Sequence, residues 1–310
     1  MPLWEEIAKT ISQHSGDVFV VRDRHGLGGG CINSAFRISD GRRSYFVKLN
    51  SGDKLAMFEA EHDGLHELAG AGAIRVPQPL ATGAAEGRAY IVMEDLPLGG
   101  SGSQAQLGRE LAALHRHGGE RFGWIRDNTI GSTPQSNQWN DSWITFWREQ
   151  RLGAQLTMAK TNGGSRKLLS QGERLLADFP KLFDGYAPVP SLLHGDLWSG
   201  NYAFMSRDGR YADEPGGSAS AMSRDGVPVI FDPAVYYGDR EADIAMTELF
   251  GGFRGDFYAA YEESWPLDPG YKVRKTFYNL YHIINHFNMF GGGYGSQAEG
   301  MMGRLLAELS

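Results

Sequence analysis

Hydrophobic and polar residues follow two different spacings along the chain. Short runs rich in β-branched and aromatic residues predict four strands in the first hundred residues, at 18–21, 35–38, 45–49 and 89–93. Apolar positions three or four residues apart predict helices at 3–14, 58–68, 104–115, 141–159, 164–179, 239–250 and 271–290. The expected fold class is therefore α+β, with a small β-rich lobe followed by a larger, mainly helical lobe.

A glycine- and serine-rich stretch separates the two parts. Residues 98–103 read LGGSGS, a composition typical of flexible connections, so we expect an N-terminal lobe at 1–97 and a C-terminal lobe at 98–310. The pentapeptide MSRDG occurs at 205–209 and again at 222–226. Two copies are too few for a repeat architecture, so we interpret them as a duplication within a flexible loop of about 206–226.

Composition excludes several classes of protein. The 310 residues carry a net charge of −7, which argues against a uniformly basic nucleic-acid binder. No run approaches the ~18 apolar residues of a membrane span, and the start of the chain lacks the pattern of a signal peptide. A single cysteine allows neither an intramolecular disulfide nor a cysteine-based zinc site. We expect a cytoplasmic monomer or weak dimer with no nucleic-acid or membrane partner.

The sequence HGDLWSGN at 194–201 carries the strongest chemical signal. Asp196 and Asn201 are five residues apart, the spacing of a kinase catalytic loop, in which the aspartate accepts a hydroxyl proton and the asparagine holds Mg²⁺. A predicted strand then ends at Asp232, where a second metal ligand belongs. The span from Asn201 to Asp232 is long for a hairpin, and removing one 17-residue repeat unit brings it to an ordinary length.

An upstream lysine and glutamate complete the pattern. Lys48 lies on a predicted strand and Glu61 on the following helix, the arrangement of the lysine–glutamate pair that orients nucleotide phosphates in kinases. Glu59 is the competing partner. We favour Glu61, because Leu65 and Leu68 then lie on the same face of the helix.

A glycine-rich turn precedes that lysine. The backbone N–H groups of Gly28, Gly29 and Gly30 could cover phosphates, since glycine permits close approach. Three glycines alone are more often an ordinary turn, and it is the order of all these features that indicates a kinase. Cys31 follows directly, and we hypothesise that its oxidation, through an intermolecular disulfide, restrains the turn. The alternative is a small residue buried under the loop.

With these motifs the chain resembles the fructosamine kinase (ketosamine 3-kinase) family, a branch of the protein-kinase-like superfold near the aminoglycoside phosphotransferases. The resemblance covers nearly the whole length, and the duplicated loop is the one departure. The Trp of the catalytic loop and the run DPAVYYGDRE are more specific than general kinase features. The motifs that carry it are GGGCIN at 28–33, YFVK at 45–48, NTIG at 128–131, QSNQW at 135–139, LHGDLWSGN at 193–201 and FDPAVYYGDRE at 231–241.

The resemblance implies a bilobed protein-kinase-like fold, with a small antiparallel sheet plus one helix in the N-terminal lobe. It implies an ATP-dependent, Mg²⁺-using kinase that phosphorylates the 3-hydroxyl of ketosamines, sugars attached to lysine or small amines, and so promotes deglycation. Asp196 is then the base, Asn201 and Asp232 hold Mg²⁺, and Lys48 contacts the phosphates with Glu61 as its partner.

Further roles follow from the same resemblance. His194 is expected to orient the catalytic loop, with Asp243 as its anchor. The adenine-binding hinge is expected to use backbone groups of four residues, Met93, Glu94, Asp95 and Leu96.

Substrate contacts remain open between two interpretations. Trp198, inside the catalytic loop, is placed to lie along the sugar, and Asn137, Trp139 and Asp141 form a polar and aromatic cluster that suits a polyol amine. The alternative is that Trp139 and Trp143 are core residues and that Asp141 caps a helix.

Two other functions stay open. The protein could phosphorylate another amine-bearing small molecule, such as an aminoglycoside, or it could be a nucleotide-binding pseudokinase scaffold. The scaffold is disfavoured because Lys48, Asp196, Asn201 and Asp232 are all present. His282 and His286 have the spacing of a metal pair on a helix, but we favour a packing or surface role because no third ligand is apparent.

Overall fold

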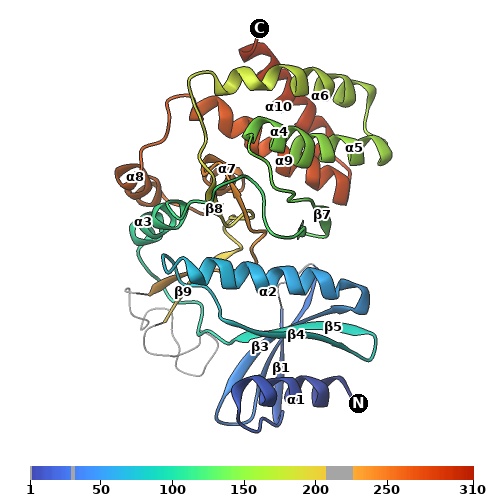
Figure 1. The fold of residues 1–310 in the computed structure, drawn as a ribbon, viewed down its shortest axis with the longest axis vertical. Helices are drawn as coiled ribbons and strands as arrows, with labels where there is room; N and C mark the ends of the chain where they lie inside the picture. The colour runs from blue at the N-terminus through green and yellow to red at the C-terminus, as the bar shows by residue number, and fades with distance from the viewer. Residues whose placement is uncertain (1, 29–31, 207–225) are drawn as a thin grey trace. The chain divides into compact units, whose positions relative to one another are not determined.

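A computed structural model describes residues 2–28, 32–206 and 226–310 (Figure 1). The chain forms two compact units, Met1–Ser103 with Tyr202–Pro233, and Gln104–Asn201 with Ala234–Ser310. These units differ from the expected lobes 1–97 and 98–310, because residues 202–233 pack with the N-terminal part. Backbone hydrogen bonds of 3.0 Å, from Gly226 N to Ser101 O and from Ile230 N to Arg75 O, attach this segment there.

The first unit is built on one antiparallel sheet. Its strand order is β1-β2-β3-β5-β4, from β1 (Asp23–Leu27), β2 (Ser34–Ser39), β3 (Ser44–Ser51), β4 (Pro79–Ala85) and β5 (Arg88–Glu94). Helices α1 (Leu3–Ser15) and α2 (Leu55–Gly70) lie on opposite faces of the sheet, and a single turn, η1 (Gly52–Lys54), precedes α2 (Figure 1). Strands β9 (Tyr202–Met205) and β10 (Val227–Ile230) form a separate antiparallel pair.

The apolar spacing of the two helices explains the core of this unit. Ile7 and Ile11, one turn apart on α1, are fully buried in the same cluster as Val47 and Val92 of the sheet. On α2, Leu65 and Leu68 are also fully buried, which places the predicted apolar face of that helix inward.

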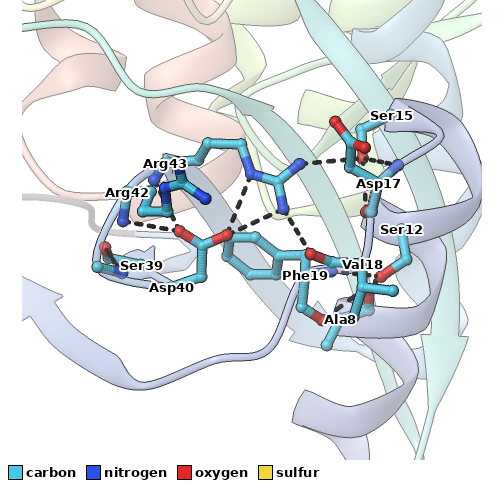
Figure 2. A network of polar contacts seen from close by, with 11 residues as sticks. Ala8, Ser12, Ser15, Asp17, Val18, Phe19, Ser39, Asp40, Arg42 and Arg43 are labelled. Atoms are coloured by element: carbon cyan, nitrogen blue, oxygen red, sulfur yellow. Dashed lines mark hydrogen bonds and ion pairs between the residues drawn. The ribbon is translucent and has the colours of Figure 1, made fainter.

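The strand predicted at 18–21 is wrong, and β1 begins only at Asp23. Side chains form hydrogen bonds with the backbone groups that would otherwise pair with a neighbouring strand. Phe19 N donates to Ser12 Oγ at 2.8 Å, and the guanidinium of Arg43 donates to Val18 O at 2.7 Å (Figure 2). The ring of Phe19 is buried while Val18 is exposed. These side-chain hydrogen bonds, rather than the β-branched composition, therefore determine the backbone of this segment.

The turn between β2 and β3 is organised by Asp40, as Figure 2 shows. Its carboxylate accepts the backbone N–H groups of Arg43 at 2.7 Å and Arg42 at 2.8 Å, and it also binds the Arg43 guanidinium. Hydrogen bonds from Arg43 and Arg42 lower the pKa of Asp40 to about 2. The side chain therefore closes the turn in its ionised form.

The second unit is mainly helical. Its longer helices are α3 (Gln104–His115), α4 (Trp143–Trp147), α5 (Gly153–Thr161), α6 (Arg166–Asp178), α7 (Glu241–Leu249), α8 (Gly255–Ser264), α9 (Tyr271–Phe290) and α10 (Tyr294–Glu308). Two short strand pairs join β6 (Asn128–Ile130) to β7 (Thr133–Gln135) and β8 (Ser191–Leu193) to β11 (Tyr236–Gly238). Helices α3 and α8 lie side by side (Figure 1). Gly108 allows their close approach, since a Cβ there would lie 2.3 Å from Phe257 O.

The helix predicted at 141–159 is divided in the structure. Ser142 is the N-cap of α4, with its hydroxyl accepting Thr145 N at 3.2 Å, so the alternative interpretation of Asp141 as the cap is wrong. A π-helical turn, η2 (Arg148–Leu152), then separates α4 from α5. A 3₁₀ turn, η3 (Phe179–Phe183), similarly follows α6.

The predicted α+β class is confirmed by the antiparallel sheet of the first unit and the helices of the second. Across the ranges that the structure describes, no helix combines the length and apolar character that crossing a membrane requires.

Candidate active site

In the first unit, Lys48 lies between two carboxylates. Its ammonium nitrogen, on β3, is 2.5 Å from Glu61 Oε1 on α2 and 2.5 Å from Asp232 Oδ1 after β10. The side chains of Lys48 and Glu61 are 7% and 10% exposed, whereas that of Asp232 is 46% exposed. The predicted pairing of Lys48 with Glu61 is confirmed, and Asp232 joins it.

Burial and charge compete within this cluster. Burial alone would lower the pKa of Lys48, but the charges of Asp232 and Glu61 more than offset it and raise that pKa. Burial raises the pKa of Glu61, against the attraction of Lys48. The ammonium group is therefore held in its charged form.

Asp232 has an unusual backbone. Its φ is +57°, in the left-handed region that residues other than glycine seldom adopt, and Pro233 follows it. Such conformations cost free energy and are concentrated at functional sites. The strained residue is also the one that brings a half-exposed carboxylate to Lys48.

The glycine-rich turn is described only in part. Gly28 is exposed, and a Cβ added to it would meet nothing within 4 Å. Gly29, Gly30 and Cys31 lie outside the described residues, as does most of the duplicated segment, so the expectations for them stay predictions.

The expected adenine-binding segment spans the end of β5. Met93 is buried opposite Phe46, and Glu94 pairs with Tyr45 across the sheet. The Glu94 side chain forms an ion pair with Arg75, and Asp95 forms one with Arg37. These ion pairs engage the side chains in the protein, which suits a segment expected to bind adenine through backbone groups. Leu96, the last residue of the expected hinge, is buried.

In the second unit, Asp243 anchors the loop that follows β8. Its carboxylate, in the first turn of α7, accepts His194 N at 2.7 Å and Gly195 N at 2.9 Å. His194 in turn accepts Asp196 N at its Nδ1, 3.3 Å away. The expected anchor is present, and it holds the loop through two backbone N–H groups.

Asn201 closes the other end of the same loop. Its amide nitrogen lies 2.9 Å from Asp196 O and 3.3 Å from Asp196 Oδ2. Together with His194, it fixes the backbone on both sides of Asp196. Carboxylate and amide oxygens are ligand types that Mg²⁺ takes, so Asn201 and Asp232 fit the metal-binding role expected of them.

A glycine is required directly before Asp196. Gly195 has φ +82°, and a Cβ there would lie 2.0 Å from Ala234 O. Ala234 N donates to His194 O at 2.8 Å, which explains the close approach of the two backbones. Any residue other than glycine between His194 and Asp196 would therefore require a local rearrangement of the backbone.

His115 is a supporting residue that sequence reasoning missed. It is fully buried at the end of α3, with Nε2 3.2 Å from Asp243 Oδ2 and Nδ1 2.8 Å from the Tyr261 hydroxyl. Burial opposes ionisation of Asp243, but hydrogen bonds from His115 and Gly195 more than offset it and lower the pKa of that carboxyl.

The run Asp239-Arg240-Glu241 is structural. Asp239 accepts the hydroxyls of Tyr278 and Tyr186, at 2.5 and 2.9 Å. Glu241 forms a buried bidentate pair with Arg274, at 2.7 and 3.0 Å. Burial raises the pKa of Glu241 to about 7 even so. This run therefore ties the start of α7 to α9. Arg240 stacks on Trp265, with its guanidinium 4.1 Å from the ring centroid.

The four residues expected to contact the substrate lie in different surroundings. Asn137 is fully buried, with its amide oxygen 2.6 Å from Arg151, which favours packing for it. Asp141 is exposed and forms an ion pair with Arg121 at 2.7 Å. Trp139 and Trp198 remain partly exposed, at 38% and 39%, and so remain available to a ligand.

The alternative of core packing is confirmed for Trp143, which is buried. It is also confirmed for His282, which is buried with its pKa lowered to about 3 by burial, and whose backbone carbonyl accepts His286 Nδ1. Among the residues that the structure describes, no group of three or more His, Cys, Asp or Glu side chains could hold a metal.

Comparison with known proteins identifies first the fold and then the family. The fold is shared with the crystal structure of an aminoglycoside phosphotransferase in ternary complex with AMP-PNP and hygromycin B. That match has a TM-score of 0.56 at 14% identity, and it covers 97% of this chain and 98% of that one. The chain thus has the fold expected of the protein-kinase-like class.

Closer similarity defines the family. The family model described as fructosamine kinase matches residues 3–308. A Synechocystis protein assigned as a ketoamine kinase is 45% identical, over 98% of this chain and 97% of its own. The chloroplastic protein-ribulosamine 3-kinase of Arabidopsis thaliana is 43% identical, over 88% and 79%. A crystal structure of a Haemophilus somnus protein assigned as a fructosamine-3-kinase has a TM-score of 0.83 at 29% identity, over 98% and 97%. The chain belongs to the fructosamine kinase family.

Proposed function

We propose that this protein is an ATP-dependent ketosamine kinase that phosphorylates the 3-hydroxyl of sugars attached to amines. The observation that carries the proposal is the loop around Asp196, held on both sides by His194 and Asn201, in a chain that also pairs Lys48 with Glu61. The name of the Arabidopsis relative, a ribulosamine 3-kinase, supports the substrate class. Mg²⁺ dependence and a cytoplasmic location belong to the same proposal.

Each residue has a distinct task in the reaction. Lys48, oriented by Glu61, binds the phosphates of ATP. Asn201 and Asp232 would hold Mg²⁺, which would offset the negative charge on the transferring phosphoryl group. Asp196 accepts the proton of the 3-hydroxyl. The hydroxyl oxygen then bonds to the γ-phosphorus while the bond to the ADP oxygen breaks. The products are ADP and a ketosamine 3-phosphate.

A product assay tests this reaction. The protein is incubated with ATP, Mg²⁺ and either ribulosyl-lysine, fructosyl-lysine or kanamycin, and ³¹P and ¹H NMR locate the phosphate. We expect ADP release with a ketosamine and a phosphate on its O3. Turnover with kanamycin alone would assign the protein to another amine-bearing substrate, and nucleotide binding without any turnover would make it a scaffold.

Replacement of the base gives a sharper test. We expect Asp196→Asn to lower kcat by about 10²–10⁴, the usual cost of losing a general base, while ATP binding by calorimetry is retained. Val189→Ala, an exposed apolar change elsewhere in the same unit, is the control. An Asp196→Asn variant within about tenfold of wild type contradicts the assignment of the base.

A further inference from the structure

Five aromatic side chains of the second unit form a continuous series, which we call the aromatic row. Ring centroids are 6.4 Å apart between Trp198 and Phe250, 5.3 Å between Phe250 and His286, 5.7 Å between His286 and Phe290, and 5.1 Å between His286 and Tyr294. The row thus begins in the catalytic loop, passes the end of α7 and continues along the end of α9 to the start of α10.

Three rings of the row are exposed to solvent, and the other two, His286 and Tyr294, are partly buried. Trp198 is 39% exposed, Phe250 is 44% exposed and Phe290 is 63% exposed. Single exposed apolar residues are ordinary, but exposed large rings in mutual contact indicate a surface that binds something. His286 fits the row as an uncharged ring, since burial lowers its pKa.

The row is attached to the catalytic loop by close contacts. Gly200 lies under the indole of Trp198, where a Cβ would be 2.3 Å from the ring. Gly252, two residues after Phe250, lies against Ser199, where a Cβ would be 2.3 Å from that of the serine. The first two rings therefore have a fixed position relative to Asp196, which lies two residues before Trp198.

We propose that the aromatic row binds the amine-bearing part of the substrate, and that this part is a peptide with apolar side chains beside its glycated lysine. The inference rests on the proposed function. The acceptor hydroxyl must lie at Asp196, so the sugar lies beside Trp198 and the rest of the substrate continues from there.

Peptide chemistry fits the remainder of the row. A ketosamine on a small amine can cover only the rings nearest the catalytic loop, whereas Phe290 and Tyr294 lie further along and need a longer ligand. Aromatic surfaces gain free energy from burying apolar side chains, and they also attract the cationic nitrogen of the ketosamine. The row is thus continuous with the acceptor site and extends beyond the sugar.

Kinetics with matched substrates test the inference. Three substrates are compared: ribulosyl-lysine, a hexapeptide with a central ribulosyl-lysine flanked by leucine and phenylalanine, and the same peptide flanked by serine and glycine. We expect Phe290→Ala to raise KM for the leucine/phenylalanine peptide about tenfold, with kcat unchanged, as for loss of an aromatic contact used only in binding. The other two substrates should change less than twofold, and Phe290→Tyr should restore the wild-type KM.

The control is Ile125→Ala, an equally exposed apolar residue of the same unit outside the row. An equal KM for the two peptides with wild-type protein, or no effect of Phe290→Ala, overturns the inference and leaves the proposed function standing. So does a wild-type dimer that Phe290→Ala dissociates in sedimentation experiments without change in kinetics, because the row would then bind a second copy. Failure of wild-type protein to phosphorylate any of the three substrates overturns the proposed function itself.

Discussion

At the scale of single residues, the charge balance around Lys48 controls both stability and activity. The ammonium group has two carboxylate partners, and Glu61 is almost completely buried. Removing the cation leaves that carboxylate without compensation, which is more costly than removing a whole pair. The stability effects of Lys48 and Glu61 must therefore be coupled.

We expect Lys48→Met to lower the free energy of unfolding by about 3 kcal/mol and to reduce kcat at least about 100-fold. Adding Glu61→Gln to that variant should recover part of the stability but none of the activity. Urea unfolding of the two single variants and the double variant gives the coupling free energy. Additive effects would show that the two side chains do not interact in solution.

Asp40 gives a pH dependence of known sign. Its pKa in the folded protein is lowered to about 2, from an ordinary value of 3.8. Its contribution to stability is thus fully present above about pH 4 and is lost as the pH falls through about 2. We expect Asp40→Asn to lower Tm at pH 7 and the Tm values of variant and wild type to converge near pH 2. A Tm difference independent of pH would contradict this reading of the turn.

At the scale of elements, the loop between α7 and α8 positions the catalytic loop. Gly252 has φ +93° and would place a Cβ against Ser199, whereas Gly251 has φ +73° with open space around it. Alanine at either position would be strained by the left-handed backbone, but only alanine at 252 would also clash with Ser199 of the catalytic loop.

We therefore expect Gly252→Ala to reduce kcat by about tenfold or more beyond the effect of Gly251→Ala, its matched control. Both variants should lose about 1 kcal/mol or somewhat more because both adopt a strained φ, and Gly252→Ala should lose more than Gly251→Ala because its Cβ would clash with Ser199. Thermal melts and steady-state kinetics of the pair separate the two effects. Equal kcat values for the two variants would mean that the contact with Ser199 has no catalytic consequence.

Local sequence patterns predicted elements well where local forces decide them. The spacing of Leu65 and Leu68 identified the buried face of α2. The segment at 18–21 failed because a hydrogen bond from Arg43, 25 residues away in sequence, decides its backbone. The helix at 141–159 was recognised, but the π-turn at Arg148–Leu152 left no mark in its apolar spacing.

At the scale of the whole molecule, the site residues that sequence revealed are those with a short-range signature. Asp196 and Asn201 share one loop, and Lys48 and Glu61 belong to consecutive elements. His115 was missed because its partner Asp243 is 128 residues away, and a histidine on an apolar helix face has no distinguishing pattern. Asn137 was assigned to substrate for the same reason, since its contact with Arg151 is visible only in the folded chain.

The division of the chain into units has a consequence for synthesis. The first unit contains residues up to 103 and then residues 202–233, so almost a hundred residues of the second unit are made before the first is complete. Asp232, the partner of Lys48, is among the last residues of the first unit to be synthesised. During translation, the β9–β10 pair and the contact between Asp232 and Lys48 can therefore form only after residue 233 has left the ribosome. A fragment that ends at 103 would never acquire the ion pair between Lys48 and Asp232.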